Sequence, residues 1–314
     1  MKPLKSLSVQ CSDLLAYLLI PLLSLLIPGR ASRKLVRSAS HWSWLLAGEL
    51  RVSLRQAANY VDIEDHAQWL QRARMVMLLE ARDLGLLMLG RQTTVFSEIA
   101  GSAQLSQARD RVLIGMHWGP SIAILALLKH LDQRPLLVFR SVERSILCHR
   151  PFFWLYLVLS VRHIRKMCGD RAITIRGAGA RLAEELPRPG TSVVVLDAPP
   201  APGRSTLIGT VAGHRVKFNA GFPEILKASG RNYHFYAITL QPGDSGLRQL
   251  ELGAACSPGD ALIEDYCRYL EDHLLADSAQ WRIWQVAGQF FVARPGAKTT
   301  KAADEASLPA EQLY

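Results

Sequence analysis

Three polar side chains of different chemistry each directly follow a short apolar run. His117 follows "VLIGM", Arg140 follows "PLLVF" and Asp197 follows "SVVVL". A histidine can take the proton of a hydroxyl that attacks a thioester, and an arginine or backbone N–H groups can stabilise the resulting oxyanion. These residue types predict acyl transfer, with His117 as the general base. The alternative, a histidine that only packs at a strand end, stays open at this point.

The turn "HWGPS" that begins at His117 leads into the apolar run "SIAILALLKHL", which predicts a helix. The first N–H groups of a helix have no partner within it and can donate to a bound anion. We therefore expect substrate to bind beside this turn. The expected substrate-binding residues are Trp118, Gly119, Ser121, Arg140 and Asp197.

From residue 111 onward, short apolar runs alternate with segments that repeat apolar residues at helical spacing. The runs "RVLIGMH", "RPLLVFR", "TSVVVLDAPP" and "YHFYAITL" predict strands. This alternation is typical of an α/β domain with a mostly parallel central sheet flanked by helices. Because sites in such sheets gather at the carboxyl ends of the strands, we expect His117, Arg140 and Asp197 to share one crevice.

The N-terminal part contains an uncharged run, "LLAYLLIPLLSLLI", from Leu14 to Ile27. These fourteen residues fall short of the roughly 20 that span a bilayer. We expect an uncleaved, membrane-associated helical segment that enters the cytoplasmic leaflet, where the cations behind it meet anionic lipid. Those cations are Arg30, Arg33, Lys34 and Arg37. A cleaved signal peptide and a buried core helix are the two alternatives.

Composition divides the chain into three parts. Residues 1–38 form the hydrophobic membrane-anchoring segment with its basic flank, and residues 39–292 form an acyltransferase-like α/β domain. Residues 293–314 lack apolar periodicity, and we expect them to be a disordered tail.

The charge balance favours anionic partners. The chain has 37 Lys and Arg residues against 27 Asp and Glu residues, a formal net charge of +10. The cations alternate with apolar runs and form no RNA-recognition signature, so we expect no nucleic-acid partner. The five cysteines are scattered without zinc-ligand spacing, and we expect no metal and no resident cofactor. A cationic cluster, residues 162–166, follows the apolar stretch "FFWLYLVLSV" and suits a phosphate, a membrane contact or plain solvation.

Taken in order, these features resemble the bacterial lipid A late acyltransferases, part of the lysophospholipid acyltransferase superfamily. The resemblance rests on His-x-Gly after a strand, on "VFR" further along the chain, and on "LDAPP" before a glycine-containing loop. The N-terminal hydrophobic segment and the helical region "LRQAANY…RARMVMLLEARD" extend it towards the N-terminus. The segments "GTVAGHRVKFNAGFPEILKASG" and "SAQWRIWQVAGQFF" extend it towards the C-terminus.

The resemblance implies a protein of the bacterial inner membrane whose site faces the cytoplasm. It implies transfer of a fatty acyl chain from acyl carrier protein or coenzyme A to a hydroxyl or amine of a lipid or glycolipid acceptor, with membrane lipids as partners. On the matching positions, His117 is the general base, Arg140 binds substrate or stabilises charge, and Asp197 stands where the family keeps an aspartate. No metal is required.

One position departs from the family's pattern. The family's signature is a histidine, four residues and then Asp or Glu, whereas here Ile122 stands in the acid's place. One explanation is that Ser121 or a backbone carbonyl orients His117, and another is that a carboxylate from elsewhere, such as Asp197 or Glu143, reaches it. The third is that the protein is a catalytically inactive lipid-binding or scaffold protein of the same fold.

Overall fold

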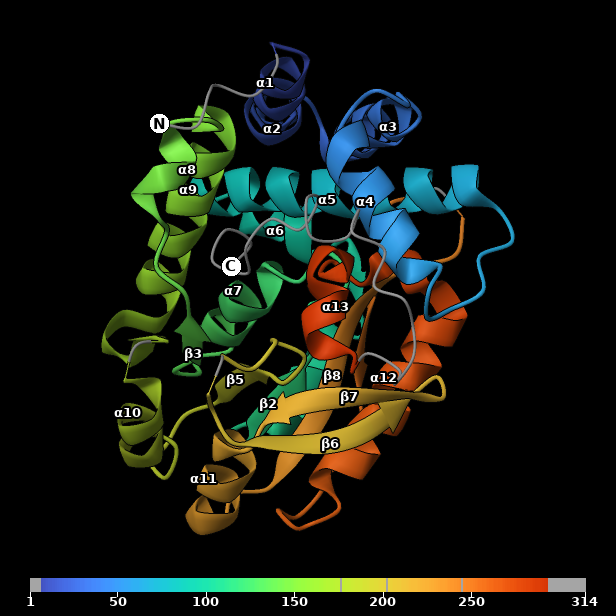
Figure 1. Ribbon diagram of the computed structural model, residues 1–314. Coiled ribbons are helices and arrows are strands. Elements are labelled where there is room, and N and C mark those ends of the chain that lie inside the picture. The colour runs from blue at the N-terminus through green and yellow to red at the C-terminus, as the bar shows by residue number, and fades with distance from the viewer. Residues whose placement is uncertain (1–6, 176, 202, 244, 293–314) are drawn as a thin grey trace.

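The computed structural model describes residues 7–175, 177–201, 203–243 and 245–292. In this part of the chain, a seven-stranded, mostly parallel sheet is flanked by helices (Figure 1). The strand order is β1-β9-β8-β2-β5-β3-β4, and a separate two-stranded sheet pairs β6 with β7. The predicted α/β class is confirmed. The segment expected to be a disordered tail, residues 293–314, lies outside the described residues.

The central strands are buried on both faces, as their continuous apolar runs predict. All neighbouring strands of the large sheet pair in parallel except β8 and β9. The strands are β1 (Ile99–Ala100), β2 (Val112–Gly115), β3 (Leu136–Phe139), β4 (Ala172–Thr174), β5 (Ser192–Val195), β6 (Thr206–Val211), β7 (His214–Asn219), β8 (Tyr233–Leu240) and β9 (Arg248–Leu252).

The register between β2 and β5 determines which residues meet at the carboxyl edge of the sheet. Val112 pairs with Ser192 and Gly115 pairs with Val195. Continued past the strand ends, the same offset brings residue 117 level with residue 197. Strand β3 pairs with the other side of β5. Arg140 therefore leaves the sheet at the same edge, but from a strand two places away from β2.

Most helices follow the expected segments, with one division. The apolar segment at 145–164 forms two helices because Pro151 begins a new one. The helices are α1 (Leu7–Leu14), α2 (Ile20–Leu26), α3 (Gly29–Ser40), α4 (Ala47–Ala57), α5 (His66–Met88), α6 (Gln92–Phe96), α7 (Ala123–His130), α8 (Arg144–Leu147), α9 (Pro151–Cys168), α10 (Ala178–Glu185), α11 (Gly221–Ser229), α12 (Leu262–Asp277) and α13 (Ala287–Phe290).

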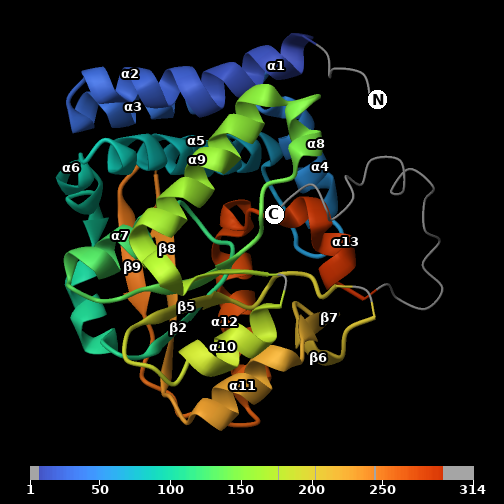
Figure 2. The same ribbon diagram turned by 90° about the vertical axis from the view of Figure 1, so that its left-hand side faces the viewer.

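Helix α5 lies across one end of the sheet, and the N-terminal helices lie on its far side (Figure 2). Its N-terminus is capped by Asp65, whose carboxylate accepts hydrogen bonds from the amides of Ala67 and Gln68 at 2.8 and 2.9 Å. A buried network of ion pairs then connects α5 to β1 and β9 at one edge of the sheet. Glu98, just before β1, accepts hydrogen bonds from Arg82 of α5 and from Arg248 of β9.

The N-terminal helix is longer than the uncharged run indicates. It extends from Leu7 to Leu26 through α1, a π-helical turn and α2, and Pro21 does not end it. These 20 residues are long and apolar enough to cross a membrane by length and composition, although 44% of the segment is buried inside the molecule. The segment is therefore a helix docked along one face, not a free hydrophobic tail.

Asp13 attaches this helix to the rest of the molecule. Arg150, immediately before α9, donates to the two carboxylate oxygens of Asp13 at 2.6 and 2.8 Å. The same guanidinium pairs with Glu49 of α4. This buried, bidentate ion pair fixes the helix's orientation on the body of the protein.

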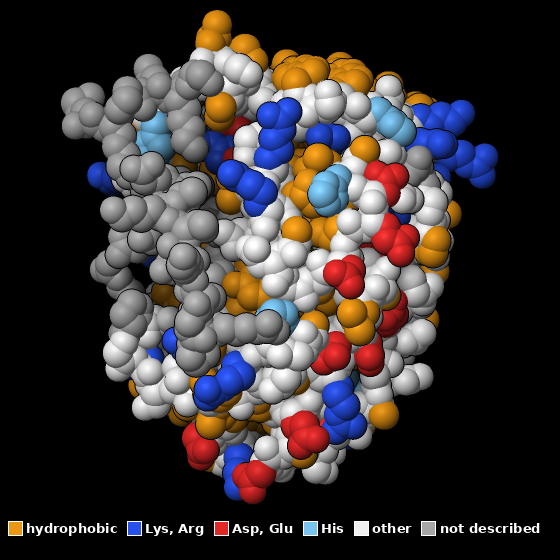
Figure 3. Space-filling view, turned by 45° about the vertical axis from the view of Figure 1, so that its right-hand side comes forward, with side chains coloured by type: hydrophobic (Ala, Val, Ile, Leu, Met, Phe, Trp, Pro, Cys, Tyr) orange, Lys and Arg blue, Asp and Glu red, His pale blue; other side chains and the backbone are white. Residues whose placement is uncertain are grey.

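The outward face of the N-terminal helix is largely apolar. Its large exposed hydrophobic side chains are Leu7, Leu19, Leu22, Leu23 and Leu26. Figure 3 shows hydrophobic side chains along the top of the molecule, with Lys and Arg side chains gathered just below them. Of the four cations expected to meet lipid, Arg30, Lys34 and Arg37 are exposed, whereas Arg33 pairs with Glu98 at 2.6 Å.

The hairpin of β6 and β7 was not predicted from the sequence. Its two-residue turn is Ala212–Gly213, with positive φ at both positions (49° and 73°), which is the geometry of a tight type I′ hairpin. Alanine is an unusual residue at positive φ, so the turn lacks the Asn-Gly or Asp-Gly sequence that normally marks it.

Candidate active site

The structure brings His117 and Asp197 into direct contact. The Nδ1 atom of His117 lies 2.8 Å from Oδ1 of Asp197, and the backbone N–H of His117 donates to Oδ2 at 2.7 Å. Because a carboxylate oxygen accepts, Nδ1 carries the proton and Nε2 is the basic nitrogen. The imidazole is 19% exposed while the carboxylate is fully buried. This is the arrangement of a general base and its orienting acid.

Asp197 is held in place from a third direction. The indole Nε1–H of Trp281 donates to its Oδ2 atom at 2.7 Å. The buried carboxylate of Asp197 is thus occupied by three donors of the protein itself, and the expected contact of Asp197 with substrate stays a prediction.

His117 thus has a carboxylate partner from elsewhere in the chain. Of the candidates from elsewhere in the chain, Asp197 reaches the imidazole, whereas Glu143 pairs with Arg140 at 3.0 Å. The hydroxyl of Ser121, the other orienting group considered, accepts a hydrogen bond from Arg282 at 3.1 Å. The Ile122 side chain packs against an apolar cluster of the core.

Arg140 stands at the expected edge of the sheet but follows a different strand. It continues β3, and β5 lies between β3 and the strand that ends at His117. Its guanidinium is partly exposed and shares its charge with Glu143. Substrate binding or charge stabilisation by Arg140 stays a prediction.

The turn after His117 is shaped by packing. Trp118 is 1% exposed and its ring meets His273 edge-on at 5.2 Å. Gly119 has a positive φ of 50°, and a Cβ there would collide with the carbonyl oxygen of Ile238. The structure thus gives both residues a structural role, and substrate contact by them stays a prediction.

The C-terminal stretch completes the site, which the sequence did not indicate. Gly119 donates its amide to the carbonyl of Gln280 at 2.9 Å, and Arg282 donates its amide to the carbonyl of His117 at 2.8 Å. These two bonds form a short antiparallel bridge between Trp118 and Trp281. The stretch "SAQWRIWQVAGQFF" entered the sequence analysis as part of the resemblance, with none of its residues singled out for the site.

The same bridge brings a second carboxylate to the site. Glu80 of α5 accepts from Nη1 of Arg282 at 2.7 Å and from the backbone N–H of Ile122 at 2.9 Å. The pKa of Arg282 is raised; burial opposes the shift, and the neighbouring Glu80 carboxylate outweighs it. Burial raises the pKa of two tyrosine hydroxyls, those of Tyr156 and Tyr236, well above the usual range. The charges of Glu80 and Arg282 contribute to both shifts.

The cationic cluster behind the apolar stretch contains three exposed cations, Arg162, Arg165 and Lys166, and one buried histidine, His163. Burial lowers the pKa of His163 to about 4, with a smaller contribution from Lys166, so this imidazole is neutral at pH 7. Neither of its ring nitrogens has a hydrogen-bond partner in the described part of the chain. Arg165 instead lies over the ring of Phe139 at 5.7 Å.

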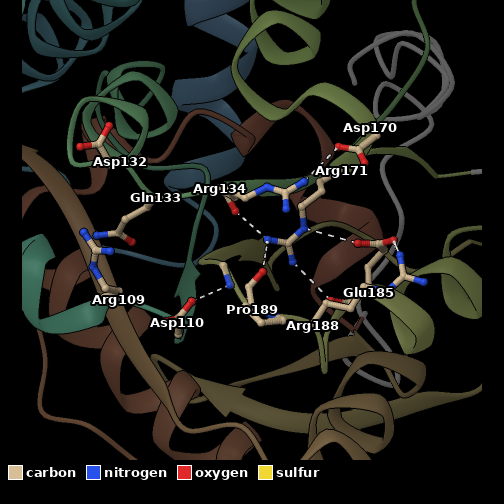
Figure 4. Close-up of a pocket in the computed structure, with 11 residues that line it drawn as sticks. Arg109, Asp110, Asp132, Gln133, Arg134, Asp170, Arg171, Glu185, Arg188 and Pro189 are labelled. Carbon is tan, nitrogen blue, oxygen red and sulfur yellow. Dashed lines mark hydrogen bonds and ion pairs between the residues drawn. The ribbon is translucent and has the colours of Figure 1, made fainter.

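A pocket of about 350 Å³ opens at the opposite, amino edge of the sheet (Figure 4). Its central side chain is Arg171, which is buried and donates to the carbonyl oxygens of Arg134, Pro189 and Glu185. The amide of Gly190 donates to Asp110 at 2.6 Å. Because these donors are used by the protein, the pocket's framework is structural.

The sequence was compared with protein-family models and with curated proteins, and none of them matches it. Among the residues that the structure describes, no group of three or more His, Cys, Asp or Glu side chains is placed to hold a metal ion.

Proposed function

We propose that the protein is a membrane-associated acyltransferase that moves a fatty acyl chain from an acyl thioester to a hydroxyl or amine of a lipid or glycolipid. The observation that carries this proposal is the His117–Asp197 pair at the carboxyl edge of a parallel sheet. Acyl carrier protein or coenzyme A is the proposed donor, and membrane lipids are the proposed partners. No metal or resident cofactor takes part.

In the proposed reaction, Nε2 of His117 removes the proton of the acceptor hydroxyl as its oxygen attacks the thioester carbonyl carbon. The C–O bond forms while the carbonyl electron pair moves onto oxygen. When the carbonyl reforms, the C–S bond breaks, and the leaving thiolate takes the proton from the imidazolium. Asp197 stabilises the imidazolium through the hydrogen bond from Nδ1.

The surface above the site suits a lipid substrate. Helix α5, which supplies Glu80, separates the site from the docked N-terminal helix with its exposed leucines and cationic flank. Such an apolar face beside cations favours association with anionic lipid. We place the protein on the cytoplasmic face of a bacterial inner membrane, in line with its resemblance to the lipid A late acyltransferases.

The test uses the full-length protein in detergent, with radiolabelled acyl carrier protein or acyl coenzyme A and extracted membrane lipids. We expect labelled lipid to form with the wild type, and to fall by at least about 10³-fold with His117→Ala. The exposed substitution Arg268→Gln on α12 serves as the control and should leave product formation unchanged. Equal, background-level product from the wild type and His117→Ala would instead favour the inactive lipid-binding alternative.

A further inference from the structure

Arg282 presents a guanidinium at the proposed site that the sequence did not single out. Its backbone bridges to His117, and its side chain reaches Glu80 and Ser121 from there. The side chain is 26% exposed while its partner Glu80 is 5% exposed. The ion pair is thus anchored on its inner side and accessible on the other.

The contacts of Arg282 leave donors available. A guanidinium has five N–H donors, and within the described residues Arg282 uses one on Nη1 towards Glu80 and one on Nη2 towards Ser121. Its Nε atom is buried and has no partner there. The second N–H on each of Nη1 and Nη2 is the donor set that an anionic oxygen can use.

The charges near the imidazole favour a cation. Asp197 contacts His117. Glu80 contacts Arg282 and the amide of Ile122, five residues after His117. An oxyanion that forms there without a cation meets two negative charges. Arg282 offsets one of them, and its own charge is retained because Glu80 keeps its pKa raised against the effect of burial.

We propose that Arg282, positioned by Glu80 and Ser121, is the residue that stabilises the oxyanion of the acyl-transfer intermediate. This assignment rests on the proposed acyltransferase function, and it replaces Arg140 in the charge-stabilising role. In the step described above, the electron pair that moves onto the carbonyl oxygen is met by the free N–H groups of Arg282. Glu80 is then a positioning residue that does not touch the reacting atoms.

The kinetic experiment measures acyl transfer by Arg282→Gln, Arg282→Lys and Arg140→Gln against the wild type. Arg282→Gln should lower kcat by about 10²- to 10³-fold with KM changed less than about threefold, because oxyanion donors act in the transition state. Arg282→Lys keeps the charge without the planar fork and should recover about tenfold of that loss. A rise in KM with kcat unchanged, or a larger kcat loss in Arg140→Gln than in Arg282→Gln, overturns the assignment.

The double substitution Glu80→Gln/Arg282→Gln distinguishes a folding defect from a loss of catalysis. It removes both partners of the ion pair together, so no buried carboxylate is left unpaired. We expect a melting temperature close to that of the wild type and the same loss of kcat as in Arg282→Gln. Restored kcat in the double variant would show that Arg282 only neutralises Glu80 and would overturn the proposal.

A binding measurement distinguishes this inference from the acyltransferase proposal itself. Hexylphosphonate, a soluble tetrahedral anion with an alkyl chain, is titrated calorimetrically into wild type, Arg282→Gln and Arg268→Gln. We expect hexylphosphonate to bind at least tenfold more weakly to Arg282→Gln than to the wild type, and to bind Arg268→Gln as it binds the wild type. Arg282-dependent binding without any acyl transfer by the wild type would refute the acyltransferase and leave the anion site standing, whereas equal binding by all three proteins overturns the anion site.

Discussion

At both the amino and the carboxyl edge of the sheet, an aspartate carboxylate accepts a hydrogen bond from a main-chain amide and so connects β2 to β5. At the amino edge, Asp110 before β2 accepts the amide of Gly190 before β5. At the carboxyl edge, Asp197 after β5 accepts the amide of His117 after β2. Both bonds join the same pair of strands, and both link residues that are 80 positions apart.

The difference lies in what surrounds each bond. At the amino edge, Arg171 gives its donors to main-chain carbonyls and is buried among them. At the carboxyl edge, a partly exposed imidazole and a partly exposed guanidinium remain beside a buried acid. We infer that one edge contributes stability and the other reactivity, and the following substitutions test that division in order of expected effect.

The largest effect is expected for Asp197→Asn. The amide cannot stabilise the imidazolium or select the tautomer with a proton on Nδ1, and in a serine-protease triad the same change costs about 10⁴ in rate. We expect a loss of kcat of that order, measured as labelled lipid formed, with a cooperative unfolding transition retained. A variant that keeps more than a tenth of wild-type kcat would show that the imidazole does not depend on this acid.

At the opposite edge, Arg171→Met should affect stability instead of rate. Its loss leaves the carbonyl oxygens of Arg134, Pro189 and Glu185 without their buried donor, at a cost of about 3 kcal/mol. Urea unfolding measures this cost, and kcat of the folded fraction should stay within about twofold of wild type. Arg188→Met, at an exposed position on the rim of the same pocket, is the matched control.

Ile122→Glu places the signature's acid at its usual position and asks whether the site needs it. We expect no gain in kcat, because Asp197 already occupies Nδ1 of His117 and Ile122 packs into the core. A carboxylate brought among apolar side chains and near Glu80 should cost about 2 kcal/mol of unfolding free energy. An increase of tenfold in kcat would mean that the present acid is a poor substitute.

His163 lies on α9, which contacts both the N-terminal helix and β4. Its pKa of about 4 is below the value of about 6.5 for the unfolded chain, so the unfolded state binds more protons between these pH values. Stability is therefore fully present above pH 6.5 and falls as the pH drops, by about 2 kcal/mol at pH 5. Comparing urea unfolding at pH 7.5 and 5 should show this drop reduced in His163→Leu and unchanged in the exposed control His66→Gln.

Local patterns account for the parts of the fold that the sequence predicted. Strand β8 occupies the predicted run, residues 233–240, because aromatic and β-branched residues make up most of it. The position of polar residues after β2, β3 and β5 likewise followed from parallel strand geometry. The β6–β7 hairpin escaped prediction because β6 is largely exposed and the turn contains alanine.

The site was only partly predictable because its partners are distant in sequence. Asp197 was one of two candidate acids, and no local pattern favours it over Glu143; the β2–β5 register makes that choice. Arg282 and Glu80 are separated by 202 positions, and no periodicity links them. Their contact follows from the bridge of Trp281 to Trp118, a tertiary pairing with no signature in either segment.

That bridge also has a temporal consequence for biosynthesis. The donors that hold Asp197 and the guanidinium beside His117 are supplied by Trp281 and Arg282, near the end of the described chain. A nascent polypeptide that has not yet reached these residues already contains the apolar helix and the imidazole, but Asp197 still lacks the indole donor and His117 still lacks the guanidinium beside it. The candidate site is therefore assembled only after the segment with Trp281 and Arg282 has been synthesised and has paired with the turn after His117.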